Sequence, residues 1–318
     1  MKEKPGFSGR RALAWAAGEL AKEEQDKEAA AGEARALLSF FTERSGLDFL
    51  LTLDEELDPA AERAFRQGVA RRRAGEPMQY ILGSQLFMER ELLTRPGVLI
   101  PRWDTEILVR AALERLRELP SGEKAAELDQ AAEPGRAAET PRVLELGVGS
   151  GAIIGSLAAE LPGLTGVAVD LAPEPLALAA DNFRLLGVAE RLELRQGSWY
   201  EPVPETERFD AIVSNPPYIT TAEMADLDPS VLAEPRLALW GGEDGLDCYR
   251  EIVPGAWRRL ADGGWLLVEI GWRQGPAVAE LFRRAGFRGV EILPDRGGRD
   301  RVALGQKVGG ERGCKAGG

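Results

Sequence analysis

The first 75 residues carry apolar side chains at the spacing of a helix. Leu37, Leu38 and Phe41 lie on one side of such a helix, and we expect Gly46 to end it. The pattern therefore predicts a helical N-terminal region.

A further helix in this region begins at an N-cap signal. Asp58 precedes Pro59, and aspartate at the N-cap with proline at the first helical position is a common helix start. Phe65 and Val69 then share one face, and the helix ends in the basic turn Arg71–Arg73. Three arginines can contact a nucleic acid, but they also complement a helix dipole at its carboxyl end, and we favour this second interpretation.

The pattern changes between residues 80 and 101. Apolar residues there alternate with glycine and proline, which favours two short strands, arranged as a hairpin, that join two domains. A helix is expected again over residues 105–118. Residues 121–140 contain one leucine and no aromatic residue, so we interpret them as a mobile surface insertion. We expect residues 307–318 to be disordered.

From Pro141 onward, short apolar runs alternate with helical stretches. Runs of this kind are typical of buried parallel strands, so we predict an α/β domain with a mostly parallel sheet. The expected strands are residues 143–146, 166–169, 192–194, 211–213, 265–270, 290–293 and 302–304, and the expected helices lie near residues 152–160, 173–186, 246–260 and 275–285.

Composition excludes several kinds of chemistry. The 318 residues include no histidine and two cysteines. Without histidine the chain has no Ser-His-Asp triad, no Cys-His pair and no His-ligated zinc. Two cysteines make neither a zinc site nor a disulfide framework, which favours a reducing, cytoplasmic location. We therefore expect no metal cofactor.

Charge and hydropathy bear on the partners. Lys and Arg number 40 against 52 Asp and Glu, a net charge of −12, so we expect no direct nucleic-acid or membrane partner. No run approaches the ~18 apolar residues of a membrane span. The apolar stretch 12–20 is interrupted by Gly18 and Glu19, and we interpret it as a first helix rather than a signal peptide.

A glycine-rich turn follows the first strand of the predicted sheet and opens a helix. Glycines there permit a tight turn and a close approach of the backbone to a ligand. The G-x-G-x-G spacing is one residue short of the dinucleotide fingerprint, and such turns also occur without a ligand. The segment consists of Glu145, Leu146, Gly147, Val148, Gly149, Ser150 and Gly151.

Two further residues follow the next strands. Asp170 follows Gly147 by 23 residues, close to the ~20 expected of a carboxylate that binds ribose hydroxyls, although such an acid is also often a helix N-cap. The turn and Asp170 together favour an adenosine-type ligand, and S-adenosylmethionine over NAD. Trp199, after the third strand, can cover an adenine ring or serve as a core or lid residue.

The motif Asn215-Pro216-Pro217-Tyr218 follows the fourth strand directly. The two prolines fix the backbone and remove two donors, which leaves the Asn215 side-chain oxygen and the Pro216 carbonyl as acceptors. Two rigid acceptors can hold both hydrogens of one NH2 group and orient a planar nitrogen toward a methyl group. Tyr218 offers a flat face to the substrate plane. The alternative is a proline-rich loop with a structural asparagine.

Over about residues 37–302 the chain resembles the protein-(glutamine-N5) methyltransferases, and within them the branch that modifies peptide chain release factors. The Asn-Pro-Pro-Tyr set is shared with adenine-N6 methyltransferases of DNA and RNA. Residues 75–83 and 100–106 are not shared, and they make the resemblance specific. The other matching segments are Gly147–Gly151, Asp170, Asn215–Tyr218, Glu234-Pro235, Gly242–Gly245 and Glu269–Gly271.

The resemblance implies three parts. They are a helical substrate-docking domain at residues 1–78, a β-hairpin linker at 79–103 and a Rossmann-like, seven-stranded class I methyltransferase domain at 104–306. It also implies methylation, from S-adenosylmethionine, of the glutamine side-chain nitrogen in the Gly-Gly-Gln motif of class 1 release factors, with S-adenosylhomocysteine as product. The implied cofactor contacts are Gly147–Gly151, Asp170, Trp199 and Asn215, and the implied substrate contacts are Asn215–Tyr218. We also expect Glu145 to bind the cofactor by contacting the amino group of its methionine part, directly or through water.

Departures from the family pattern are few. Ser198 stands where an acid is frequent, Trp103 replaces a commoner proline, and residues 121–140 are longer than usual. None of them touches the atoms that we expect to transfer the methyl group.

Three alternatives stay open. A sister enzyme modifies a glutamine of a ribosomal protein, and Asp104-Thr105-Glu106 count against it. The acidic net charge and the lack of a basic stripe count against an adenine-N6 enzyme. The intact Asn215–Tyr218 counts against a noncatalytic adaptor. We predict a cytoplasmic monomer in which the amide nitrogen attacks the methyl carbon in line, with its hydrogens held by Asn215 and the Pro216 carbonyl.

Overall fold

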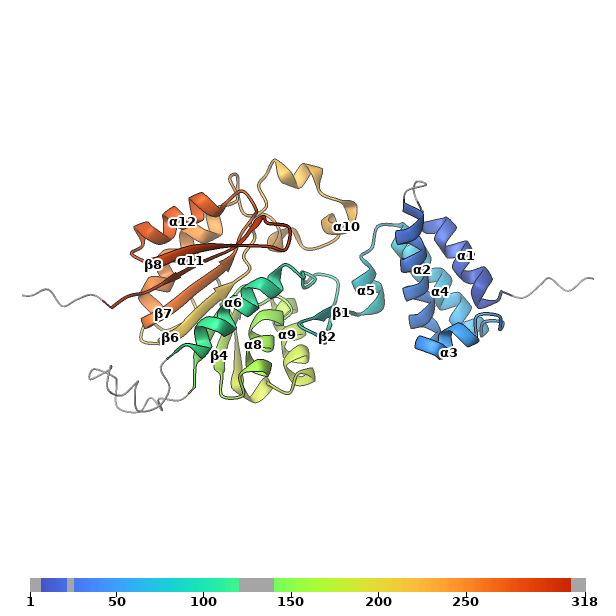
Figure 1. The fold of residues 1–318 in the computed structure, drawn as a ribbon, viewed down its shortest axis with the longest axis horizontal. Coiled ribbons are helices and arrows are strands. Elements are labelled where there is room, and N and C mark those ends of the chain that lie inside the picture. Colours follow the sequence, from blue (N-terminus) through green and yellow to red (C-terminus); the bar gives the residue numbers. More distant parts are fainter. Residues whose placement is uncertain (1–6, 22–25, 120–139, 310–318) are drawn as a thin grey trace, which may run out of the picture. The chain divides into compact units, whose positions relative to one another are not determined.

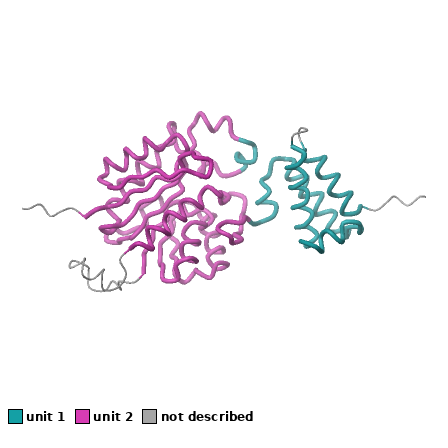
Figure 2. The backbone as a smooth tube through the Cα atoms, viewed as in Figure 1, with its two compact units in different colours: residues 1–84, 228–233 teal, residues 85–227, 234–318 magenta. Residues whose placement is uncertain are grey.

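The computed structural model describes residues 7–21, 26–119 and 140–309. The chain divides into two compact units, residues 1–84 with 228–233, and residues 85–227 with 234–318 (Figure 2). We call them the helical unit and the sheet unit. The expectations for most of residues 121–140 and for residues 310–318 fall outside the described residues, and the three-part division of the chain stays a prediction.

The helical unit is built on small and aromatic side chains. Ala12 and Ala16 are fully buried one turn apart on α1, and Ala34 is fully buried on α2. Phe65 and Val69 of α4 complete this core, as their shared face predicts. The helices are α1 (Gly9–Leu20), α2 (Lys27–Thr42), α3 (Gly46–Leu51), α4 (Pro59–Arg73), α5 (Met78–Leu82) and the short α10 (Pro229–Leu232).

One predicted helix boundary in this unit is confirmed and another is wrong. The Asp58 carboxylate accepts hydrogen bonds from the backbone of Ala60 and Ala61, as expected of the N-cap of α4. Gly46 does not end α2. The helix ends at Thr42, because Glu43 turns left-handed with φ 53°, and Gly46 instead begins α3.

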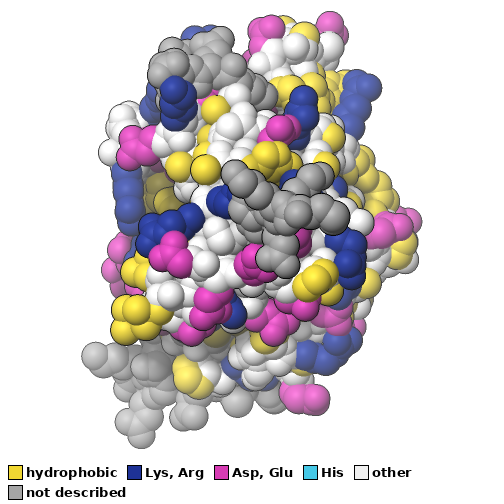
Figure 3. All heavy atoms as spheres, turned by 90° about the vertical axis from the view of Figure 1, so that its right-hand side faces the viewer, with side chains coloured by type: hydrophobic (Ala, Val, Ile, Leu, Met, Phe, Trp, Pro, Cys, Tyr) yellow, Lys and Arg dark blue, Asp and Glu magenta, His cyan; other side chains and the backbone are white. Residues whose placement is uncertain are grey.

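The three arginines at the end of α4 are each paired with a glutamate. Arg71 binds Glu76, Arg72 binds Glu33 in a two-bond contact, and Arg73 binds Glu19. On the face drawn in Figure 3, basic and acidic side chains are interspersed. The pairing supports the structural interpretation of this basic turn over a nucleic-acid contact.

The predicted hairpin is present. Strands β1 (Ser84–Phe87) and β2 (Arg90–Leu93) form a two-stranded sheet. Met88 and Glu89, which join them, have φ values of 48° and 60°, as in the turns that best match the twist of a hairpin. The apolar residues near Ile81 lie in α5 rather than in a strand.

The sheet unit contains a seven-stranded sheet, and each expected strand is present. The strand order is β5-β4-β3-β6-β7-β9-β8. Strands β3 to β7 are parallel, and β9 lies antiparallel to both β7 and β8. The bounds are β3 (Arg142–Leu146), β4 (Thr165–Asp170), β5 (Leu192–Gln196), β6 (Phe209–Ser214), β7 (Leu260–Glu269), β8 (Arg288–Pro294) and β9 (Asp300–Gln306).

Helices cover both faces of this sheet (Figure 1). Neighbouring strand residues alternate between two cores, as Val143 packs in one and Leu144 in the other. Helices α6 (Thr105–Arg117), α8 (Ala152–Glu160) and α9 (Pro173–Leu185) line the first core, and α11 (Asp247–Arg259) and α12 (Gly275–Arg284) line the second. Short 3-10 segments are Ala189–Arg191, Glu223–Asp226 and Arg236–Ala238.

Candidate functional site

The strand register brings the predicted site residues to one edge of the sheet. Leu146 of β3 is paired with Val169 of β4 and with Ser214 of β6, and Ser214 is paired with Val268 of β7. The residues that follow these four positions therefore lie together at the carboxyl edge, where ligands bind in open α/β sheets. They are Gly147, Asp170, Asn215 and Glu269.

The turn after β3 uses glycine for its backbone shape. Gly147, Gly149 and Gly151 have φ values of 70°, 54° and 77°, in the left-handed region. A Cβ on Gly151 would also lie 2.6 Å from a ring carbon of Phe183. By contrast, a Cβ on Gly149 would meet nothing within 4 Å. The turn is therefore closely packed at Gly151 and leaves space beside Gly149.

Asp170 is attached to this turn. Its carboxylate accepts a hydrogen bond from the Gly149 amide at 3.0 Å and another from the Ala172 amide at 3.2 Å. Burial raises the pKa of Asp170, and the backbone hydrogen bonds oppose that rise. The carboxylate is therefore fixed beside the glycine turn, in the place predicted for a ribose-binding acid.

Glu145 lies beneath the turn. Its side chain is 1% exposed, and its carboxylate accepts a hydrogen bond from the Ile154 amide in the first turn of α8 at 2.9 Å. Burial raises the pKa of Glu145 well above its ordinary value, and the nearby charge of Asp170 adds to the rise. Contact with a ligand amino group stays a prediction for this residue.

Trp199 lies next to the same turn. It is half-buried, its φ is 45°, and one of its ring carbons lies 3.9 Å from the position of a Cβ on Gly147. The ring also packs against the second sheet core. The structure thus brings together the glycine turn, Asp170 and Trp199. In the sequence, Gly147 and Trp199 are 52 residues apart.

Asn215 and Tyr218 are held by a buried hydrogen-bond network. Asn215 Nδ2 donates to Thr105 Oγ1 at 3.2 Å, and the Thr105 hydroxyl donates to Glu269 Oε2 at 2.6 Å. The Tyr218 hydroxyl donates to the other oxygen of Glu269 at 3.1 Å. The side chain of Gln274 donates to the Tyr218 carbonyl at 2.9 Å. Both ends of the Asn-Pro-Pro-Tyr motif are therefore fixed by surrounding side chains.

Glu269 is the centre of this network and is 1% exposed. Burial raises its pKa, whereas hydrogen bonds from Thr105 and Tyr218 and the charge of Arg301 lower it. Arg301 also pairs with Asp104 at 3.2 Å. The contacts of Thr105 and Glu269 with the Asn-Pro-Pro-Tyr motif are not predicted from the sequence. An available signal was an acid at the end of a strand, the same signal that identified Asp170.

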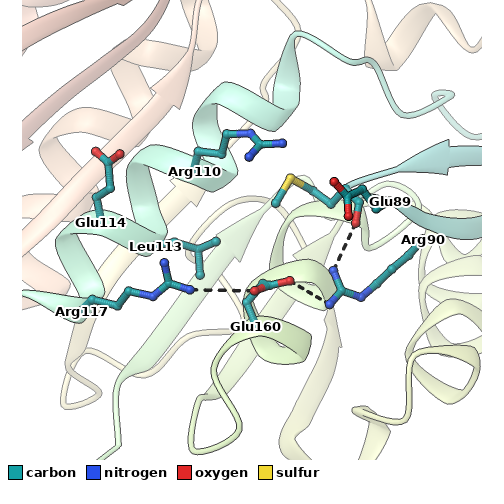
Figure 4. A pocket seen from close by; sticks show the side chains of 8 residues that line it. Glu89, Arg90, Arg110, Leu113, Glu114, Arg117 and Glu160 are labelled. Atoms are coloured by element: carbon teal, nitrogen blue, oxygen red, sulfur yellow. Dashed lines mark hydrogen bonds and ion pairs between the residues drawn. The ribbon is translucent and has the colours of Figure 1, made fainter.

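A separate cavity of about 490 Å³ lies where the hairpin turn meets α6 and α8 (Figure 4). Glu160 lies between Arg90 and Arg117 there and forms ion pairs with both. No residue of this cavity belongs to the predicted site. Three arginines and three glutamates line it, so it offers no clear charge preference to a ligand.

The described residues contain no group of three or more His, Cys, Asp or Glu side chains placed to hold a metal ion. In the same part of the chain, every helix is too short or too polar to cross a bilayer.

Two protein families match the sequence. The PrmC N-terminal domain matches residues 11–83, and a methyltransferase domain matches residues 143–232. The first match spans helices α2 to α5 and most of α1, and the second contains the glycine turn, Asp170 and Asn215.

Full-length relatives cover most of the chain. The release factor glutamine methyltransferase of Moorella thermoacetica is 44% identical over 86% of this chain and 89% of that protein. The protein of the same name from Geobacter sulfurreducens is 42% identical over 96% of this chain and 99% of that protein. A solved protein-(glutamine-N5) methyltransferase from Alicyclobacillus acidocaldarius is 32% identical over 68% of this chain and 99% of its own, with a TM-score of 0.37. The chain therefore belongs to the family of release factor glutamine methyltransferases.

Proposed function

We propose that this enzyme transfers a methyl group from S-adenosylmethionine to the glutamine side-chain nitrogen in the Gly-Gly-Gln motif of class 1 release factors. The observation that carries the proposal is the position of Asn215. It lies at the same sheet edge as the glycine turn and Asp170, with its NH2 group already bound by Thr105. The names of the relatives support a release factor as the substrate.

The glycine turn and Asp170 suit an adenosine ligand. Space beside Gly149 allows close approach of a ligand to the backbone. Asp170 keeps acceptor capacity for ribose hydroxyls beyond its two backbone hydrogen bonds. Trp199 offers an adenine ring an apolar face. When bound here, S-adenosylmethionine supplies a methyl group activated by its positively charged sulfur.

The acceptor side must overcome the weak nucleophilicity of an amide. The lone pair of an amide nitrogen is delocalised into the carbonyl, so it must be oriented and electrostatically assisted to attack. Asn215 Oδ1 and the Pro216 carbonyl would accept the two N–H hydrogens and stabilise the positive charge that grows on the nitrogen. Tyr218 would pack on the amide plane. The nitrogen then releases one proton to water, which leaves a neutral methylamide.

Two carboxylates favour the cationic ligand electrostatically. Asp170 is half-buried and Glu145 is 1% exposed, so a positive ligand meets two acidic side chains in a region of reduced solvation. Binding of a cation would in turn stabilise the ionised forms of both carboxylates. This reciprocity would give both acids near the glycine turn a part in cofactor binding.

The direct test is a labelling assay with separate acceptors. We would incubate the enzyme and isotope-labelled S-adenosylmethionine with a purified release factor, with ribosomes or with nucleic acid, and locate the label by mass spectrometry. Label on the Gly-Gly-Gln glutamine is expected, and a release factor with alanine in place of that glutamine is the matched control. Label on a ribosomal protein or on adenine instead would overturn the proposed substrate.

A further inference from the structure

We propose that Glu269 and Thr105 form a directional hydrogen-bond relay that fixes the orientation of the Asn215 amide, and that they are positioning residues for methyl transfer. The inference rests on the proposed function and adds to it the reason why Asn215 presents an acceptor. Neither residue is expected to touch the substrate nitrogen.

The direction of the relay starts at Glu269. An ionised carboxylate has no proton to donate, so both of its contacts must come from donors. Thr105 supplies one at 2.6 Å and Tyr218 supplies the other at 3.1 Å. Burial raises the pKa of Glu269, and the hydrogen bond from Thr105, the charge of Arg301 and the hydrogen bond from Tyr218 oppose that rise by favouring the ionised carboxylate.

Thr105 transmits this direction to Asn215. A threonine hydroxyl has one proton, and that proton is used in the bond to Glu269. Its oxygen can therefore only accept from Asn215, which must turn its NH2 group toward Thr105, at 3.2 Å. The other amide atom of Asn215, Oδ1, is then the one left for a substrate.

The opposite direction would defeat the chemistry. If position 269 donated to Thr105, the threonine proton would point to Asn215 and favour the rotated amide, with Oδ1 bound to Thr105. Asn215 would then present NH2 to the NH2 group of the substrate, and two donors repel each other. The relay thus distinguishes two states of Asn215 that have almost the same shape.

The surroundings hold the three residues in place. Thr105 is 4% exposed and Glu269 is 1% exposed, so bulk water is excluded from both. They belong to α6 and β7, whereas Asn215 follows β6. An ion pair between Arg301 of β9 and Asp104 fixes the start of α6. Because several elements meet here, the relay depends on the complete sheet unit.

The first test separates hydrogen bonding from packing at one position. Thr105→Val keeps the shape of the side chain and removes the hydroxyl, so we expect kcat to fall about 10- to 100-fold. Thr105→Ser keeps the hydroxyl, and its kcat should stay within about threefold of wild type. Cofactor affinity, measured by calorimetry, should be the same for both. Equal losses in the two variants would indicate packing and overturn the relay.

The second test reverses the relay without removing a partner. In Glu269→Gln the new amide should offer its oxygen to Tyr218 and its NH2 group to Thr105. We therefore expect kcat to fall about 10-fold or more, and a thermal melting curve checks that the variant is folded. A variant with wild-type kcat would overturn the proposal.

The third test restores satisfied hydrogen bonds with a second substitution. Asn215→Asp alone places a second carboxylate opposite Thr105, whose one proton cannot serve both, so we expect a lower melting temperature. In Asn215→Asp/Glu269→Gln, the amide at 269 can donate to Thr105 and Thr105 can donate to the carboxylate at 215. The double variant should melt above Asn215→Asp and recover part of its lost kcat. Additive changes in melting temperature would contradict the relay.

These tests are separable from the proposed function. Thermal stability and cofactor binding need no release factor. If the wild-type enzyme labels another acceptor, the proposed substrate is wrong while the stability cycle still reports on the relay. If the wild-type enzyme labels the release factor and the cycle is additive, the substrate stands and the relay is wrong.

Discussion

The two units differ in whether polar side chains are buried in them. In the described part of the chain, all buried polar or charged side chains belong to the sheet unit. The helical unit instead keeps its charges at the surface, as in the ion pair of Arg72 with Glu33. The buried set is Thr94, Thr105, Glu145, Ser150, Ser156, Asn182, Ser214, Glu234, Arg259 and Glu269.

This difference shows that the sheet unit bears the free-energy cost of burying the polar groups of the candidate site. A buried polar group destabilises a protein unless it is hydrogen-bonded, and a buried charge costs more. At its carboxyl edge the sheet unit buries Glu269 and satisfies both of its oxygens with hydrogen bonds from Thr105 and Tyr218. The helical unit, with an apolar core, has no comparable cluster among its described residues. Substitutions in the two units should therefore change different measurements.

The largest effect is expected at Asn215. Asn215→Ala removes an acceptor that we expect to act in the transition state, so kcat should fall by about 10³-fold or more. Cofactor affinity, measured by calorimetry, should change little because the glycine turn and Asp170 are intact. Turnover near the wild-type rate would show that the acceptor role of this residue is wrong.

A large effect on stability alone is expected at Phe65. The ring is fully buried in the helical unit, so Phe65→Ala should destabilise that unit by about 3–5 kcal/mol. Chemical denaturation followed by circular dichroism would measure the loss. Phe40→Ala is the matched control, because Phe40 is 45% exposed and should lose far less. Cofactor binding that falls together with the helical unit would contradict the separation of roles.

A smaller effect, on binding, is expected at Asp170. Asp170→Asn weakens a charge-assisted contact to ribose, so the cofactor dissociation constant should rise about 10- to 100-fold. The surface carboxylate Asp181, which pairs with Arg95 and Arg184, offers the control Asp181→Asn. If both variants bind the cofactor equally well, Asp170 is not the ribose-binding acid.

The pH dependence of cofactor binding sharpens this assignment. Burial raises the pKa of Asp170, so the carboxylate takes up a proton at a higher pH than an exposed aspartate does. Cofactor affinity should therefore fall with decreasing pH, beginning above the ordinary aspartate value of about 3.9. The pKa of neighbouring Glu145 is also raised, so titrations of Asp170→Asn and Glu145→Gln should each lose part of this dependence. An unchanged profile in Asp170→Asn would contradict its contribution.

The smallest effect is expected at the surface of the helical unit. Arg72→Ala removes the ion pair with Glu33, in which both side chains are about a quarter exposed. A partly solvated pair contributes little, so unfolding should become easier by about 1 kcal/mol or less. A double-mutant cycle with Glu33→Gln measures the pairwise part. A coupling several times larger would mean that this unit, too, depends on specific polar contacts.

The sequence predicts the strands of the sheet unit well, because each is a short apolar run separated by helices. It also predicts the carboxyl edge, since residues that follow parallel strands must meet there. It does not predict the partners of Asn215. Thr105 precedes Asn215 by 110 residues and Glu269 follows Thr105 by 164, and no local pattern encodes contacts over such distances.

The wrong prediction for the end of α2 has a local cause. The end of α2 is at Thr42 because Glu43 adopts the left-handed conformation that a glycine commonly supplies after a helix. Gly46 also has a positive φ, of 54°, but it uses it to begin the next helix. A glycine can indicate a positive φ both at the end and at the start of a helix. Its position in the sequence alone does not distinguish the two.

The placement of β9 has a consequence for biosynthesis. Strand β9 lies between β7 and β8 although it follows both in the chain. Both β7 and β8 are therefore synthesised before the strand that pairs with them on this side of the sheet. Arg301, whose charge favours the ionised form of Glu269, belongs to the same strand. The full strand order and this charge near Glu269 therefore both require the last strand of the sheet to have been synthesised.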